Sequence, residues 1–212
     1  MKLAVKTPGK IRNLLFDLGN VLMDIDIHRT VEAFKALRIE GLAEKDIHPH
    51  QKDFFLQLEL GAISPDEFIA ILRRTYPVAA DVTDAQLWDA WNALLLDFEP
   101  RRFELLRRLR PQYRIFLLSN TNLPHRQCFL ERFRRQMGTD FESYFDKCYY
   151  SDALRMRKPD PGIYRYVLQD AGIEAQETFF IDDNACNFPG AEALGLNCCH
   201  LTRDRHVCDL FE

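Results

Sequence analysis

The chain has 212 residues, of which 47% are apolar, and its formal net charge is −4. This length suits one large domain or a domain with an insertion, and the apolar share excludes an intrinsically disordered chain. The mildly acidic balance, without a long run of one charge, argues against nucleic acid or a membrane surface as a partner.

The first predicted strand covers residues 11–16 and ends at the carboxylate of Asp17. Its Leu and Phe content is typical of a strand that is buried on both faces, and Gly19-Asn20 follows as a turn signal. In open α/β sheets, ligands bind at the carboxyl ends of the strands. Asp17 is therefore a candidate nucleophile or metal ligand, and an Asp that only caps a turn is the alternative. The irregular stretch 18–27 predicts a small hairpin.

Residues 28–97 predict consecutive helices without an intervening strand. Apolar residues recur there at helical spacing, and Gly61 is a plausible helix stop. Ser64 and Thr83 each begin a capping box, in which a Glu or Gln follows three residues later. The second box predicts a helix whose apolar face continues to Leu95.

From residue 100 onward, strand and helix patterns alternate. Helices are predicted at 100–110, 123–137, 161–172 and 189–194, and strands at 113–118, 147–150, 178–181 and 196–201. Alternation of this kind predicts an α/β fold with a parallel sheet wrapped by helices. We therefore expect a sheet domain of residues 1–27 and 98–212, with a helical domain of residues 28–97 inserted after the first strand.

Polar clusters follow several of the predicted strands. They comprise Asp17, Ser119-Asn120, Lys158 and Asp182-Asp183. Because the carboxyl ends of parallel strands share one edge, these side chains can converge. Converging carboxylates repel one another without a cation, and Mg²⁺ suits a site of few carboxylates completed by phosphate and water. A nucleophile, a metal and donors for the phosphoryl oxygens are the requirements of phosphoryl transfer.

The cysteines and the N-terminus indicate where the protein resides. None of the six cysteines forms a C-x-x-C pair, which favours a reduced, cytoplasmic protein. The apolar run of residues 1–5 is too short for a secretory signal, and no apolar stretch reaches the roughly 20 residues of a membrane span. Cys198, Cys199, His200, His206 and Cys208 are close in sequence, but neighbours on a strand point to opposite faces, which argues against a zinc site.

Four segments resemble, in order and spacing, the four motifs of the haloacid dehalogenase-like (HAD) hydrolase superfamily. They are Asp17-Leu18-Gly19-Asn20-Val21, Leu118-Ser119-Asn120, Arg157-Lys158-Pro159 and Ile181-Asp182-Asp183-Asn184. The resemblance implies a Rossmann-like core, and residues 28–97 resemble the helical cap of subfamily I. Within the superfamily, the chain is similar to the bacterial sugar-phosphate phosphatases that carry the motif Phe-Asp-Leu-Gly-Asn-Val, such as α-D-glucose-1-phosphate phosphatase. His28, Gln51, Phe54 and Phe55 are cap residues that are candidates to face the site.

The resemblance implies a Mg²⁺-dependent phosphatase of small phosphorylated metabolites, with sugar phosphates as the expected substrates. Asp17 would form an aspartyl phosphate and bind Mg²⁺ together with the Gly19 carbonyl, Asp182 and Asp183. Ser119 and main-chain NH groups near Asn120 would hold phosphoryl oxygens. Lys158 would neutralise the nucleophile and the phosphate.

One position departs from the family pattern. Most phosphatases of this superfamily carry a second Asp, a general acid and base, two residues after the nucleophile, where this chain has Gly19. Asp24, Asp26 and His28 are candidate substitutes, and Gly19 is a candidate for positive φ. Gly19 also favours an alternative function, a weakened protein that binds phosphosugars as a regulator. A metal-independent 2-haloacid dehalogenase is the third interpretation.

Overall fold

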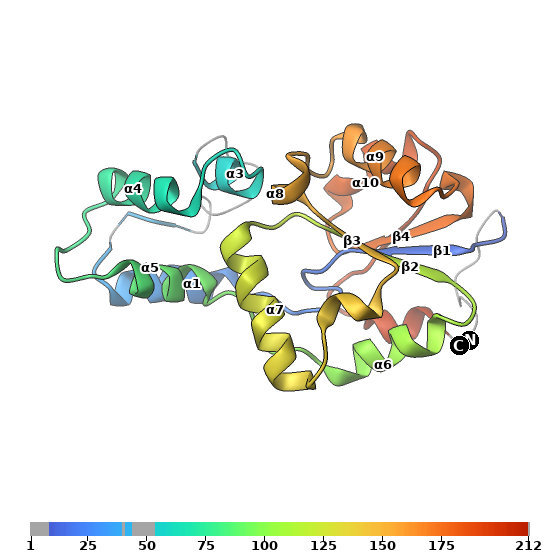
Figure 1. Ribbon diagram of the computed structural model, residues 1–212, viewed down its shortest axis with the longest axis horizontal. Coiled ribbons are helices and arrows are strands. Elements are labelled where there is room, and N and C mark those ends of the chain that lie inside the picture. Colours follow the sequence, from blue (N-terminus) through green and yellow to red (C-terminus); the bar gives the residue numbers. More distant parts are fainter. Residues whose placement is uncertain (1–8, 40, 44–53, 212) are drawn as a thin grey trace.

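The computed structural model describes residues 9–39, 41–43 and 54–211. A parallel sheet of five strands, in the order β3-β2-β1-β4-β5, lies at the centre of the larger part of the molecule (Figure 1). The strands are β1 (Asn13–Phe16), β2 (Arg114–Ser119), β3 (Lys147–Tyr150), β4 (Thr178–Asp182) and β5 (Asn197–His200). The predicted α/β class and parallel sheet are therefore confirmed. The predictions for residues 1–5 and Gln51 lie outside the described residues.

The register of the central strands fixes the place of the site. Phe16 of β1 pairs with Leu117 of β2 on one side and with Ile181 of β4 on the other. The residues that follow these positions, Asp17 and Asp182 among them, therefore reach the same edge of the sheet.

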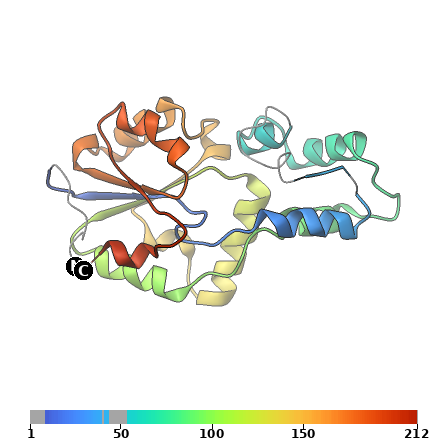
Figure 2. The same cartoon turned by 180° about the vertical axis from the view of Figure 1, so that it is seen from behind.

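Successive side chains of β1 supply two separate hydrophobic clusters, because neighbours on a strand point to opposite faces. Leu14 and Phe16 pack on the face covered by α6 (Pro100–Leu109), α7 (Leu123–Met137) and the 3₁₀ turn η4 (Val207–Leu210). Leu15 packs on the opposite face, beneath α9 (Pro161–Ala171) and α10 (Phe188–Glu192). Figure 2 shows these two layers from behind. Short segments complete the fold: α8 (Ser151–Leu154), η1 (Phe141–Tyr144), η2 (Ala175–Glu177) and η3 (Ala185–Asn187).

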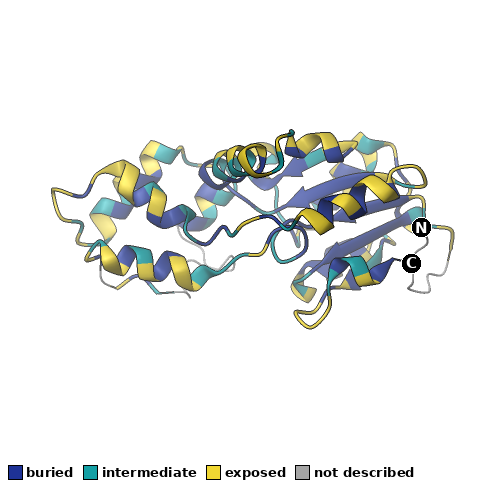
Figure 3. Cartoon of the chain, turned by 90° about the horizontal axis from the view of Figure 1, so that it is seen from below, coloured by how far each residue is buried: buried dark blue, intermediate teal, exposed yellow. Residues whose placement is uncertain are grey.

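A group of helices lies beyond the carboxyl edge of the sheet and has its own buried core (Figure 3). It comprises α1 (Ile27–Ala36), α3 (Phe54–Glu59), α4 (Pro65–Thr75) and α5 (Asp84–Asn92), which we call the helical region. Both predicted capping boxes, at Ser64 and Thr83, are confirmed by reciprocal hydrogen bonds. The exact domain boundaries at residues 27 and 97 stay a prediction.

The two connections between the sheet and the helical region pair with each other. The amide of Asp26 donates to the carbonyl of Leu94 at 2.9 Å, and that of Leu96 donates to Asp24 at 3.1 Å. The prediction of a hairpin within residues 18–27 is therefore wrong, because the second half of this stretch finds its partner about 70 residues away. The helix α5 ends at Asn92, before Leu95, because the residues that follow it pair with the other connection.

Candidate active site

A cavity of about 190 Å³ lies at the carboxyl edge of the sheet, between the sheet and the helical region. Its sheet side is lined by Asp17, Gly19, Ser119, Asn120, Lys158 and Asp183. From the helical region come Phe55, Leu56, Glu59 and Trp91. The structure thus brings the predicted polar clusters together around one cavity.

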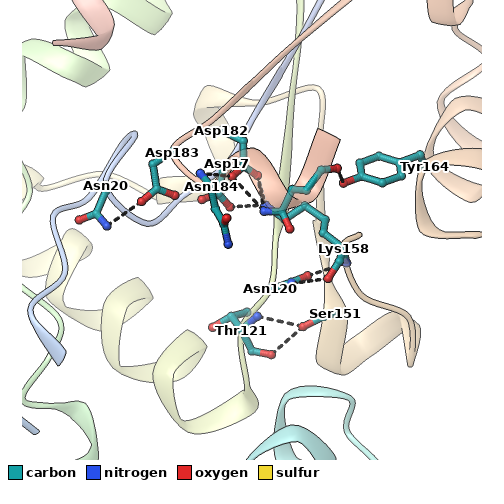
Figure 4. Close-up of polar contacts among 11 residues, drawn as sticks. Asp17, Asn20, Asn120, Thr121, Ser151, Lys158, Tyr164, Asp182, Asp183 and Asn184 are labelled. Carbon is teal, nitrogen blue, oxygen red and sulfur yellow. Dashed lines mark hydrogen bonds and ion pairs between the residues drawn. The ribbon is translucent and has the colours of Figure 1, made fainter. Parts of the chain in front are cut away.

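Lys158 ties two of the predicted carboxylates together. Its Nζ lies 2.6 Å from Asp17 Oδ1 and 2.6 Å from Asp182 Oδ2, and the residue is only 1% exposed (Figure 4). Asn120 holds the backbone of Lys158 at both ends. Its Nδ2 donates to the Lys158 carbonyl at 3.0 Å, and its Oδ1 accepts from the Lys158 amide at 2.9 Å. The Asn120 side chain therefore positions the lysine.

The neighbouring residues Asp182 and Asp183 have different surroundings. Asp182 is completely buried and accepts hydrogen bonds from Lys158, from Nδ2 of Asn187 to both oxygens at 2.9 Å, and from the amide of Asn184 at 2.8 Å. These bonds use most of the acceptor positions of one carboxylate. Asp183 instead lines the cavity. Asp183 is therefore the more accessible of the two carboxylates to a metal ion, and Asp182 anchors Lys158.

Asn20 fixes the orientation of Asp183 from the turn after β1. Its Nδ2 donates to Asp183 Oδ2 at 2.9 Å, and its Oδ1 accepts from the amide of Ile25 at 3.2 Å. Asn20 has a left-handed backbone with φ 54°, a conformation that Asn tolerates better than most residues. The expectation of positive φ at Gly19 is wrong by one residue.

The convergence of these carboxylates is electrostatically unfavourable without a further cation. Burial raises the pKa of Asp17 to about 7, the Lys158 charge opposes this shift, and the charges of Asp182 and Asp183 add to it. Burial also raises the pKa of Asp183. One carboxylate oxygen from each of the three Asp residues lies within 4.8 Å of the others. An all-oxygen donor set of this kind fits a hard divalent cation such as Mg²⁺.

A neutral histidine that the sequence did not single out lies beside the cavity. Asn122 Oδ1 accepts from the amide of His125 and from Trp91 Nε1, so the Asn122 Nδ2 must face His125 Nδ1, at 2.9 Å. His125 Nε2 lies 3.1 Å from the Trp91 carbonyl, which can only accept, so Nε2 carries the proton. Burial lowers the pKa of His125 to about 4. His125 therefore holds Trp91 and stays uncharged near neutral pH.

Comparison with known proteins identifies the family. The sequence-family model of the haloacid dehalogenase-like hydrolases matches residues 11–195 of this chain. The chain belongs to the haloacid dehalogenase-like hydrolases. It is 32% identical over 188 residues to a D-ribitol-5-phosphate phosphatase of Bacteroides thetaiotaomicron, covering 87% of this chain and 89% of that protein. The predicted family is thus confirmed, while the resemblance to glucose-1-phosphate phosphatases stays a prediction.

Solved structures of HAD proteins superpose on most of the chain. A HAD enzyme of B. thetaiotaomicron in complex with magnesium has a TM-score of 0.87 and 37% identity, covering 95% of this chain and 98% of its own. A predicted HAD-like hydrolase of Porphyromonas gingivalis has a TM-score of 0.82 and 34% identity, over 95% of this chain and 96% of its own. These structures confirm the predicted HAD fold.

The three candidate substitutes for the acid and base missing at Gly19 lie outside the lining of the cavity. Asp24 binds Arg102 at 2.8 Å, and Asp26 caps α1 by accepting from the amide of His28. The side chain of His28 is mostly exposed. None of the three belongs to the residues that line the cavity.

The remaining predicted positions divide between the cavity and its surroundings. Ser119 lines the cavity at the end of β2, as expected. The main-chain NH of Thr121, near Asn120, donates to Ser151 Oγ at 2.9 Å and is therefore engaged. Of the predicted cap residues, Phe55 lines the cavity, and the ring of Phe54 stacks on the ring of Phe55 in the core of the helical region.

No helix among the described residues is long and apolar enough to span a membrane.

Proposed function

We propose that this HAD hydrolase is a Mg²⁺-dependent phosphatase of small phosphorylated polyols or sugars, with Asp17 as its nucleophile. The observation that carries the proposal is the arrangement of Asp17, Lys158 and Asp183 at the floor of a cavity that the helical region covers. Its relatives support the substrate class and the metal. One is a D-ribitol-5-phosphate phosphatase, and a related HAD enzyme was solved with magnesium and inorganic phosphate.

Asp17 would attack phosphorus while Lys158 holds its other oxygen. Lys158 bonds to Oδ1 at 2.6 Å, which leaves Oδ2 to form the new P–O bond as the bond to the leaving oxygen breaks. The leaving alkoxide would take its proton from water. Water would then displace phosphate from the aspartyl phosphate and regenerate the carboxylate. Mg²⁺, held by Asp17 and Asp183 with the Gly19 carbonyl, would neutralise the charge that develops on the phosphoryl oxygens. Ser119 lies at the same end of the cavity and would bind one of these oxygens.

The helical region would act as the cap of the site. It brings apolar side chains, Phe55 and Leu56 among them, over the polar floor of the cavity. A cover of this kind excludes bulk water and thereby strengthens the electrostatic interactions beneath it. The paired connections at Asp26–Leu94 and Asp24–Leu96 are the segments about which this region would open.

The test is phosphate release from D-ribitol 5-phosphate by the purified protein. We expect turnover with Mg²⁺, loss of turnover in EDTA, recovery on adding Mg²⁺ back, and no turnover by Asp17→Asn. Binding of the phosphate ester without hydrolysis would favour the regulatory alternative that Gly19 suggests. Chloride release from a 2-chloroacid in EDTA would establish the dehalogenase alternative.

A further inference from the structure

An ion pair inside the cavity joins the helical region to the loop that carries Lys158. Arg157 Nε lies 2.5 Å from Glu59 Oε1, and the two side chains are only 15% and 16% exposed. Glu59 ends α3, and its main-chain carbonyl accepts from Ser151 Oγ at 2.9 Å, which fixes the end of this helix on the core. Both residues line the cavity that also contains Asp17.

The pair has polar atoms to spare. This bond uses one of the three guanidinium nitrogens of Arg157 and one of the two carboxylate oxygens of Glu59. The other two guanidinium nitrogens and the second carboxylate oxygen have no protein partner within residues 9–39, 41–43 and 54–211. These atoms are accessible to solvent. The pair therefore offers donors and an acceptor side by side within the cavity.

Two other polar side chains on this side of the cavity, those of Asn122 and His125, are already engaged. Both amide atoms of Asn122 and both ring nitrogens of His125 take part in the network with Trp91. Phe55 and Leu56 add apolar surface to this wall, and Thr121 adds a hydroxyl group. Glu59 and Arg157 are the charged side chains on this side of the cavity within the described residues, and their surplus atoms can recognise a polar group there.

We propose that the Glu59–Arg157 pair binds hydroxyl groups of the leaving alcohol and selects uncharged, polyhydroxylated phosphate esters over apolar or carboxylated ones. This inference rests on the proposed phosphatase function and assigns the residues that choose its substrate. A hydroxyl both donates and accepts, so it can satisfy the free carboxylate oxygen and a guanidinium NH together. A carboxylate on the substrate would be repelled by Glu59, and an alkyl chain would leave the surplus atoms without a partner.

The test compares three phosphate esters as substrates in the presence of Mg²⁺. D-Ribitol 5-phosphate carries hydroxyls, n-pentyl phosphate has the same chain length without them, and phosphoglycolate carries a carboxylate. Glu59→Gln preserves the side-chain volume and removes the charge. We expect it to lower kcat/KM for ribitol 5-phosphate about tenfold, mainly through KM, and to change pentyl phosphate by less than about twofold. Phosphoglycolate should be hydrolysed faster, because Arg157 is released from its partner.

Two further variants separate substrate selection from structural damage. Arg157→Gln should lower the preference for ribitol 5-phosphate in the same way, but without a gain on phosphoglycolate, since no cation is released. Asp84→Asn removes an exposed carboxylate that pairs with Arg73 at 2.6 Å within the helical region, and should leave the three rates unchanged. Equal losses on ribitol and pentyl phosphates in Glu59→Gln and Arg157→Gln, or no loss on either, would overturn the inference while leaving the phosphatase intact. Absence of Mg²⁺-dependent hydrolysis of all three esters by the wild type would refute the phosphatase itself.

Discussion

Replacing Asp17 by Asn removes a buried charge that the fold tolerates poorly without a metal. The pKa of Asp17 rises from its ordinary 3.8 to about 7, chiefly because the carboxylate is buried. The folded-state pKa lies above the unfolded one, so the folded protein binds the extra proton between roughly pH 4 and pH 7. The stability that this proton supplies is therefore present at low pH and is lost as pH rises through about 7.

The size of the effect follows from the shift. At about 1.4 kcal/mol for each pH unit within the window, the unfolding free energy of the metal-free wild type should fall by roughly 2–3 kcal/mol between pH 5 and pH 8 from this group alone. For a chain of this length, that difference corresponds to a Tm change of about 5–10 °C. Asp17→Asn lacks the titrating group, so this part of the pH dependence should disappear while Lys158 keeps its bond to Asp182.

The assay is thermal or urea unfolding in EDTA at pH 5 and pH 8, for the wild type and Asp17→Asn in parallel. The quantity of interest is the pH-induced stability change of the wild type minus that of the variant, because other titrating groups largely cancel. Mg²⁺ at pH 8 should stabilise the wild type more than the variant, since one ligand is missing. The same pH dependence in both proteins would refute a buried Asp17 with a raised pKa.

Further substitutions separate the roles of residues around the site. Asp183→Ala should raise the Mg²⁺ concentration needed for half-maximal activity, whereas Asp182→Ala should mainly lower the unfolding free energy, by roughly 3–5 kcal/mol, because Lys158 loses a buried partner. A larger shift in Mg²⁺ requirement for Asp182→Ala than for Asp183→Ala would contradict this division. Asn20→Gly keeps the left-handed backbone but removes the donor to Asp183, so it should weaken Mg²⁺ binding about tenfold, measured by titration of activity. Gly19→Asp is sterically feasible, because the atom nearest to a Cβ there is the flexible end of the Ile25 side chain at 3.3 Å, and Asp17 Oδ2 lies 4.0 Å away. It should speed hydrolysis of alkyl phosphates at least about tenfold, and p-nitrophenyl phosphate less, because nitrophenolate leaves without a proton. Equal acceleration of both esters would show that the new carboxylate does not act on the leaving group.

Local sequence determined the parts of this protein whose interactions are local. The strand that precedes Asp17 is apolar and buried from Leu14 to Phe16, and the capping boxes at Ser64 and Thr83 satisfy their own helix ends. Strand and helix patterns in alternation predicted the parallel sheet, and a parallel sheet places its strand ends at one edge. For that reason the meeting of Asp17, Lys158 and Asp183 could be anticipated from the chain alone.

Tertiary structure decided which partner each side chain found. Asp182 and Asp183 are adjacent in sequence, but Asp182 turns inward to Lys158 and Asn187 while Asp183 faces the cavity and Asn20. Pairing between residues 24–26 and 94–96 could not be read from either segment, because each is irregular by itself. In the sequence, Glu59 is only the last residue of an amphipathic helix, which does not indicate a role in the site. Its partner Arg157 lies 98 positions away in the chain. Periodicity reports which face of an element is buried, and only the packing of the helical region on the sheet settles which charged groups share that buried space.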